Sequence, residues 1–203
     1  MYIANMASIP IHVHHSRTIH SEMPDWCILD LDPKDASFLH VIKIAKEIHK
    51  LCEELGLPNY IKTSGSTGLH ILLPLKNQFT FEQSRVLAEL LARIITNRLP
   101  DIATIARNPA RRDGKVYIDY LQNGQGKTIA SAFCVRPLPD APVSLPIRWS
   151  EVNNKLKPNS FNIKNAVSRV KRCKQDPALE VLDAEVDLVE VLDALAKEYS
   201  ALS

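Results

Sequence analysis

The stretch DWCILDLDPKD, residues 25–35, places two aspartates at the end of an apolar run and directly before a proline. The run is typical of a buried β-strand, in which side chains two positions apart point to the same face. Asp30 and Asp32 therefore project together, about 6–7 Å apart. Neighbouring carboxylates repel each other unless a cation lies between them, and Mg²⁺ and Mn²⁺ prefer such oxygen ligands. An alternative is equally open, in which Asp30 caps a turn and Asp32 accepts hydrogen bonds from backbone amides before Pro33.

The rest of the chain alternates helical and strand patterns. Thr80 and Gln83 resemble a capping box that opens a helix reaching about residue 95. Because neighbouring strand patterns are close enough to form antiparallel hairpins, the order predicts a mixed α/β fold. The remaining expected elements are a helix at 37–55, a strand, glycine turn and strand at 60–75, strands at 115–121 and 128–136, an irregular proline-rich segment at 137–160, and helices at 163–173 and 178–201, the last one capped by Asp176.

Length and composition predict one globular domain over residues 1–203. The chain is 45% apolar and 24% charged, which is ordinary for such a domain. It contains neither an apolar run of membrane-spanning length nor a signal-peptide pattern, so we expect a cytoplasmic protein without a membrane partner. The four cysteines are scattered without a C-x-x-C pair, which favours reduced thiols over a zinc site or disulfides.

The formal net charge of +2 conceals an uneven distribution. Residues 176–203 contain eight acidic side chains and one basic side chain. Residues 1–175 therefore contain 24 basic and 15 acidic side chains, a formal charge of about +9. A basic body of this kind is compatible with a polyanionic partner such as nucleic acid, although surface lysines often serve only solubility.

Two further motifs carry candidate chemistry. Asp119 is an acid within the apolar strand pattern YIDYL. The segment TSGSTGLH, residues 63–70, combines two glycines with three hydroxyl groups, a pattern whose backbone N–H groups can face a phosphate. His70 alternates with Leu69 and Ile71, so it should lie on the opposite face from that apolar pair. A tight hairpin with a hydrogen-bonded histidine is the alternative explanation.

Basic residues flank the strand pattern that contains Asp119. Arginine binds phosphate through two parallel hydrogen bonds, and the strand that ends at Arg136 is expected beside the strand of Asp119. For at least one of Arg111 and Arg112, a solvated basic face is the simpler interpretation. The flanking set consists of Arg111, Arg112, Lys115, Lys127 and Arg136.

Four segments together resemble a known family. DLDP, SGSTGLHILLPL, VYIDYLQNGQGKTIASAFCVRP and APVSLPIRWSEV are similar to the polymerase domain of DNA ligase D from bacteria and archaea, a branch of the archaeo-eukaryotic primase superfamily. The three superfamily motifs, a D-x-D, a serine–histidine element and a later lone aspartate, occur in the expected order. The resemblance runs from about residue 2 to about residue 183.

The resemblance implies a fold and a site. The fold would be a primase-like, RNA-recognition-like α/β core with a mixed, largely antiparallel sheet and flanking helices. Asp30, Asp32 and Asp119 would be the catalytic acids that hold two Mn²⁺ or Mg²⁺ ions. The expected nucleotide-binding residues are His12, Ser64, Thr67, Gly68, His70, Lys127 and Arg136, and the DNA-binding candidates are Arg111, Arg112 and Lys115.

The resemblance also implies an activity and partners. The protein would be a DNA-end-directed nucleotidyltransferase that joins an NTP or dNTP to a 3′-hydroxyl and releases pyrophosphate by a two-metal mechanism. Family members favour ribonucleotides and often manganese, and they act on 5′-phosphorylated, gapped or overhanging ends in non-homologous end joining with Ku and a ligase.

Two departures from the family pattern keep other hypotheses open. Thr67 occupies a position where many relatives have lysine, and the family has a substantial segment before residue 2. We therefore expect self-association or a complementing N-terminal chain. A catalytically weak DNA-end-binding or scaffolding module, such as half of a split polymerase, is the second hypothesis. A phosphohydrolase of the haloacid dehalogenase type, which also uses D-x-D, is the third.

Overall fold

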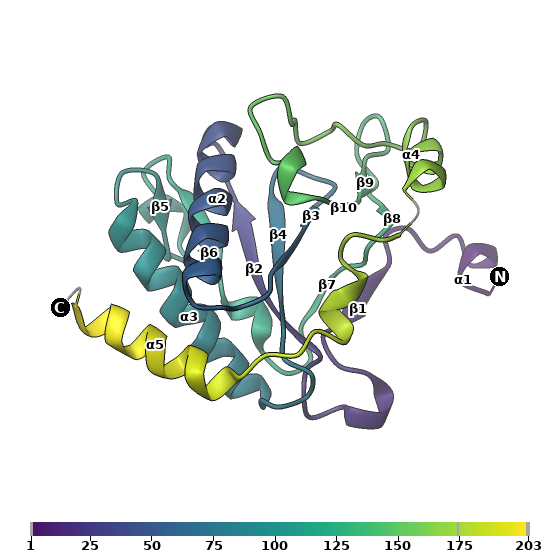
Figure 1. The fold of residues 1–203 in the computed structure, drawn as a ribbon. Helices are drawn as coiled ribbons and strands as arrows, with labels where there is room; N and C mark the ends of the chain where they lie inside the picture. Colours follow the sequence, from purple (N-terminus) through teal and green to yellow (C-terminus); the bar gives the residue numbers. More distant parts are fainter. Residues whose placement is uncertain (1, 174, 202–203) are drawn as a thin grey trace.

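A central sheet with the strand order β10-β3-β4-β2-β6-β5 organises the fold (Figure 1). The computed structural model describes residues 2–173 and 175–201. Every neighbouring pair in this sheet is antiparallel except β5–β6, so the expected mixed, largely antiparallel sheet is confirmed. Its strands are β2 (Trp26–Asp32), β3 (Tyr60–Thr63), β4 (Leu69–Pro74), β5 (Ala103–Thr104), β6 (Val116–Asp119) and β10 (Pro146–Ile147).

Two small antiparallel sheets lie beside this central sheet (Figure 1). One pairs β1 (His12–His14) with β7 (Thr128–Ala130), and the other pairs β8 (Cys134–Val135) with β9 (Val143–Ser144). The helices are α1 (Tyr2–Asn5), α2 (Phe38–Glu54), α3 (Phe81–Arg98), α4 (Ala166–Arg172) and α5 (Leu188–Ala201), with 3₁₀ turns at 18–20, 109–111, 121–123, 149–151 and 179–182.

The two faces of the central sheet have different coverings. Leu29, Leu31 and Ile71 are fully buried in the main core, to which α2, α3 and α5 contribute. On the opposite face, Ile28 and Leu72 pack in a smaller cluster with residues of β1, β7 and the 179–182 turn. This smaller cluster covers only part of the second face, which leaves space there for polar side chains.

Local signals explain where the long helices begin and end. Ser37 accepts a hydrogen bond from the Leu39 N–H at the start of α2, and the Thr80–Gln83 capping box is present at the start of α3. At the other end of α3, Arg98 forms ion pairs with three glutamates, which tie α3 to α2 and α5: Glu47, Glu54 and Glu198.

The expected hairpin of the 115–121 and 128–136 strands is wrong. β7 pairs with β1 rather than with β6. Asn123 explains the separation, because its side chain accepts from the Ile28 N–H and donates to the Ile28 carbonyl, both at 2.8 Å. Asn123 thereby takes the position of a strand partner beside β2. The second strand is also broken near Phe133, which has a positive φ of 62°.

The expected helix at 178–201 begins later, at Leu188. Asp176 does cap a turn by accepting from the Ala178 N–H, but only a 3₁₀ turn follows. Val181 packs on the β1–β7 side of the sheet, whereas Leu188 and the rest of α5 join the main core on the other side. A continuous helix would not reach both faces, so the chain breaks between them.

The state of the cysteines and the apolarity of the helices bear on two expectations drawn from composition. The cysteines at 27, 52, 134 and 173 are free thiols, and the first three are buried. Among the described residues, no helix combines the length and apolarity that crossing a bilayer requires.

Gly68 is required by close packing of the turn against β2. A Cβ atom at this position would collide with the Leu31 carbonyl oxygen. We expect Gly68→Ala to lower the free energy of unfolding by about 2 kcal/mol or more, because a backbone atom has to move. Gly124→Ala is the control: its Cβ would lie 3.4 Å from the flexible Lys127 side chain and 3.7 Å from the Leu121 carbonyl oxygen, an ordinary contact distance, so the change should stay within about 0.5 kcal/mol. Equal urea-unfolding curves for the two variants would contradict this packing.

Candidate active site

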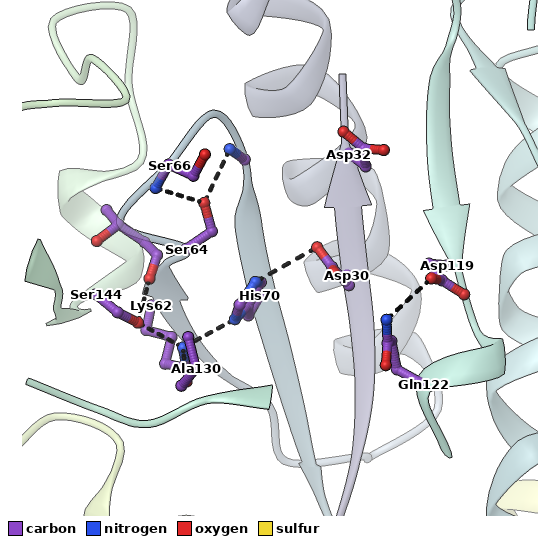
Figure 2. A network of polar contacts seen from close by, with 12 residues as sticks. Asp30, Asp32, Lys62, Ser64, Ser66, His70, Asp119, Gln122, Ala130 and Ser144 are labelled. Carbon is purple, nitrogen blue, oxygen red and sulfur yellow. Dashed lines mark hydrogen bonds and ion pairs between the residues drawn. The ribbon is translucent and has the colours of Figure 1, made fainter. Parts of the chain in front are cut away.

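A row of four polar side chains crosses the open face of the central sheet. The strand registers pair Lys62 with His70, His70 with Asp30, and Asp30 with Asp119. Residues that pair directly across strands project to the same face. Figure 2 accordingly shows these side chains side by side on β3, β4, β2 and β6. The prediction that His70 lies opposite Leu69 and Ile71 is confirmed, because both of those side chains lie in the main core.

Asp30 lies at the centre of the row. Its Oδ1 atom is 3.4 Å from His70 Nε2, and the side chain is only 20% exposed. Burial, followed by the charges of Asp119 and Asp32, raises the pKa of Asp30 to about 7, although Lys62 and Arg136 act in the opposite direction. The ionised carboxylate is therefore only partly compensated, which is an environment that favours a bound cation.

Asp32 is held by different partners. Arg112 Nη1 donates to its Oδ2 at 2.7 Å, and the Lys34 N–H donates to its Oδ1 at 3.1 Å. The guanidinium of Arg112 also lies over the Tyr117 ring, 4.3 Å from its centre. The alternative in which Asp32 accepts from backbone amides thus holds in part, since one of its oxygens accepts from one such amide, although this amide is that of Lys34, after Pro33.

Asp119 ends β6 within its own hydrogen-bond network. Its Oδ1 accepts from Tyr117 Oη at 3.1 Å and from the Leu121 N–H at 2.9 Å, and its Oδ2 accepts from Gln122 Nε2 at 3.2 Å. Burial and the Asp119 charge raise the pKa of the Tyr117 hydroxyl, which keeps that group a hydrogen-bond donor. These contacts fix the orientation of the carboxylate.

The three carboxylates lie near one another but face different partners (Figure 2). Within residues 2–173 and 175–201, no group of three or more acidic, histidine or cysteine side chains has an arrangement that could hold a metal ion. The donor chemistry nevertheless fits Mg²⁺ or Mn²⁺, because all three ligands are carboxylate oxygens and the pKa of Asp30 is raised by the other two acids. Such an ion would compete with Arg112 for Oδ2 of Asp32.

The glycine turn is held together by a serine hydroxyl. Ser64 Oγ accepts from the Ser66 N–H at 3.0 Å and from the Gly68 N–H at 3.1 Å. These two N–H groups are therefore bonded within the turn, and the prediction that backbone N–H groups of the turn face a phosphate stays a prediction for the rest of it. The Ser64 hydroxyl still has a hydrogen of its own to donate.

Arg136 reaches this turn from β8 and not from a strand beside β6, so its predicted place next to the strand of Asp119 is wrong. Its Nη1 donates to the Ser64 carbonyl at 3.0 Å. Its Nε is buried and has no hydrogen-bond partner among the described residues, which leaves a donor for an anionic ligand. Gly65, with a φ of +70°, allows the close approach, because a Cβ there would lie 2.8 Å from Arg136 Cγ.

Two cavities, which share Gln122 as a wall, lie on the site face. The first has a volume of about 240 Å³, and the second, of about 420 Å³, opens beside Asp119. The first is lined by Asp30 and Asp32 together with His12, Ser64, Ser66, Thr67, Gly68, His70 and Arg136. The second is lined by Asp119, Arg107, Arg112, Tyr117, Leu121 and Lys127.

A family model described as the primase-polymerase domain of LigD matches residues 1–178. The chain belongs to the LigD primase-polymerase domain family. It is 33% identical over 174 residues to the bifunctional non-homologous end joining protein LigD of Bacillus subtilis. The aligned region covers 85% of this chain and 28% of that protein. It is 30% identical over 166 residues to the multifunctional LigD of Pseudomonas aeruginosa, covering 81% of this chain and 20% of that one.

The fold of this LigD-type domain also matches a solved structure. The polymerase domain of Mycobacterium tuberculosis ligase D, in complex with DNA, superimposes with a TM-score of 0.79 at 25% sequence identity, covering 91% of this chain and 67% of that one. The chain spans less than a third of the length of the two curated LigD proteins described above. The family match replaces the haloacid dehalogenase hypothesis.

The structure groups most, but not all, of the predicted site residues. The first cavity gathers the nucleotide-binding candidates except Lys127, which lines the second cavity with Arg112. Arg112 is mostly buried and serves as the ion-pair partner of Asp32. Arg111 and Lys115 line neither cavity, and the DNA-binding roles proposed for all three basic residues stay predictions.

Sequence reasoning missed two residues of this LigD-type site. Gln122 separates the cavities and binds Asp119. Lys62 completes the polar row and is only 2% exposed. A lysine within the otherwise apolar β3 pattern was the available signal for Lys62, because burying an ammonium group requires hydrogen-bond partners.

The raised pKa of Asp30 predicts a pH-dependent cost in stability. The carboxyl ionises near pH 3.8 when unfolded but only near pH 7 when folded, so its contribution to the free energy of unfolding falls as the pH rises through that window. We expect metal-free Asp30→Asn protein to be more stable than wild type by about 2 kcal/mol at pH 8, after allowance for partial exposure, and equally stable at pH 4.

Urea unfolding in the presence of a chelator at both pH values measures this difference. Asp101→Asn, at an exposed aspartate outside both cavities, is the control and should change little at either pH. A difference between wild type and Asp30→Asn that is the same at pH 4 and pH 8 would contradict the prediction.

Proposed function

We propose that this LigD-type domain is a nucleotidyltransferase that extends 3′-hydroxyl ends at DNA breaks with nucleoside triphosphates. The observation that carries the proposal is the first cavity. Asp30 and Asp32 line this cavity together with the Ser64 turn, His70 and Arg136. Acids for cations and donors for phosphate oxygens thus meet in one place, as in-line phosphoryl chemistry requires.

The phosphate-binding part of the cavity consists of three donors. Ser64 retains a hydroxyl hydrogen, Arg136 retains its buried Nε–H, and His70 lies between them and Asp30. His12, on β1, also lines this cavity, and burial together with the Arg136 charge lowers its pKa. A triphosphate in this position would gain charge-assisted hydrogen bonds, mainly from Arg136.

Asp30, Asp32 and Asp119 are the residues that would hold Mn²⁺ or Mg²⁺. Bound divalent ions would lower the pKa of the attacking hydroxyl and neutralise charge on the leaving pyrophosphate. Asp119 is already oriented by Tyr117 and Gln122. At Asp32 the ion would compete with Arg112 for Oδ2 or bind through Oδ1.

The second cavity supports a site for the DNA strand. Arg107, Arg112 and Lys127 line it beside Asp119, so phosphates of a primer would meet positive charge next to the catalytic acids. The similar mycobacterial domain was solved in complex with DNA. Action in non-homologous end joining, with Ku and a ligase at 5′-phosphorylated gaps or overhangs, and a preference for ribonucleotides and manganese belong to the same proposal.

A DNA-end-binding module with weak catalysis is the second candidate. The Arg112–Asp32 ion pair of 2.7 Å favours it, because Arg112 already neutralises one of the acids expected to bind the cation and occupies one of its oxygens. Catalytic activity on DNA distinguishes the two candidates.

Primer extension on a gapped, 5′-phosphorylated duplex with manganese tests the proposal. Wild type should add a few nucleotides, whereas Asp30→Ala and Asp119→Ala should lower the rate at least about a hundredfold, because both remove ligands of the proposed ions. Asp35→Ala, an exposed aspartate beside the D-x-D motif, is the control and should keep wild-type activity. A wild type that binds the duplex but is as inert as the variants would establish the binding-module candidate instead.

Arg136→Ala separates nucleotide binding from DNA binding. Because Arg136 faces the first cavity, its loss should weaken nucleotide affinity about tenfold and leave affinity for the duplex within about twofold. Arg172→Ala, at an exposed arginine outside both cavities, is the matched control. Equilibrium titrations with a nucleoside triphosphate and with labelled duplex measure both affinities. Equal losses of the two affinities would place Arg136 in the DNA path.

A further inference from the structure

Lys62 is a buried cation to which the proposed reaction gives no task. Its Nζ atom lies 2.8 Å from the Ala130 carbonyl oxygen, 2.6 Å from Ser144 Oγ and 2.8 Å from His70 Nδ1 (Figure 2). A buried ammonium group is costly unless its hydrogens are bonded. The chemistry of the three partners determines which atom donates the hydrogen in each contact.

Each of the three hydrogens of the charged Lys62 side chain has one acceptor. The Ala130 carbonyl can only accept. Ser144 Oγ donates its one hydrogen to the Thr63 carbonyl at 2.8 Å, so it also accepts from Lys62. Burial lowers the pKa of Lys62 to about 7, so below that pH the group is an ammonium with three hydrogens and no lone pair. Its third hydrogen is then left for His70 Nδ1.

This assignment determines which nitrogen of His70 bears the proton. A ring nitrogen that accepts a hydrogen bond bears no hydrogen, so a His70 ring whose Nδ1 accepts is neutral and has one N–H, on its other nitrogen. Because Nδ1 accepts from Lys62, the proton is on Nε2, the atom that faces Asp30 at 3.4 Å. With the opposite tautomer, Nε2 would present a lone pair to the carboxylate oxygen and could not donate to a phosphate.

We propose that Lys62 is a positioning residue that holds His70 in the tautomer with hydrogen on Nε2, so that His70 can donate to a phosphate oxygen in the first cavity. The identity of the phosphate ligand rests on the proposed function, but the tautomer does not. A third cavity, of about 290 Å³, is lined by Lys62 together with Leu72 and Ile129 of the smaller apolar cluster, so this cluster lies beside the lysine. Low polarity on that side strengthens the hydrogen bond to the ring.

Nitrogen-15 NMR of the imidazole rings in the full chain tests the proposal directly. The His70 signals are assigned by comparison with His70→Gln. We expect Nδ1 of wild type to resonate as an unprotonated nitrogen and Nε2 as a protonated one, without metal and at a pH about one unit below the pKa of Lys62, where the lysine is charged. A proton on Nδ1 in wild type would overturn the proposal, whatever the variants do.

Two variants of the lysine network separate positioning from packing. Lys62→Met keeps the length of the side chain but cannot donate, so His70 should lose its preference for the Nε2–H tautomer. Ser144→Ala removes a different partner of the same lysine, so it should lower stability but leave the His70 tautomer unchanged. An unchanged tautomer in folded Lys62→Met, or a changed one in Ser144→Ala, would contradict the assignment.

Titration with magnesium-ATP connects the tautomer to the ligand. Lys62→Met should raise the dissociation constant about tenfold, whereas Ser144→Ala should raise it less than threefold. If wild type shows the Nε2–H tautomer but ATP does not bind, the proposed function fails and the positioning role stands. If ATP binds equally well to wild type and to a Lys62→Met variant with an altered tautomer, the role of Lys62 in phosphate binding is overturned.

Discussion

The antiparallel register of β2 with both of its neighbours is the constraint on which the site depends. It places His70 and Asp119 on either side of Asp30 in one row across the sheet. A slip of one residue would turn Asp30 toward the helices, where Leu29 and Leu31 now fill the core. The energy of the apolar core therefore holds the acids on the open face. Gly68 allows the following turn to lie against the end of β2 without a side chain in the way.

The row across the sheet also sets the electrostatics of the site. Acids occupy β2 and β6, whereas Lys62 supplies positive charge from β3, and His70 separates the two. Burial raises the pKa of Asp30 and lowers that of Lys62, each to about 7, so the sheet stabilises neither charge fully. Such a site costs folding stability in the absence of ligands, as functional sites commonly do. Cations at the acids and an anion near His70 would each relieve part of that cost.

The sequence was sufficient for features that depend on local spacing, and insufficient for features that depend on how the chain turns. Asp30 and Asp32 share a face because they are two residues apart in a strand, and Thr80 caps α3 because the capping box is local. The separation of β6 from β7 follows from a long-range contact of Asn123 with Ile28, which no spacing rule contains. Arg136 consequently lines the first cavity with the other nucleotide-binding candidates, but it arrives there from another sheet.

The fold shows where α5 and the basic side chains of the site lie relative to the central sheet. The acidic helix α5 packs into the main core through Leu188 and its neighbours, on the face of the central sheet opposite the polar row (Figure 1). Arg98 fastens α5 there through Glu198. The two cavities, with Arg112, Lys127 and Arg136 in their walls, lie on the other face. A polyanion that approaches the site therefore meets these basic side chains, while the three acidic side chains of α5, Glu190, Asp193 and Glu198, are held behind the sheet, where distance and salt weaken their repulsion.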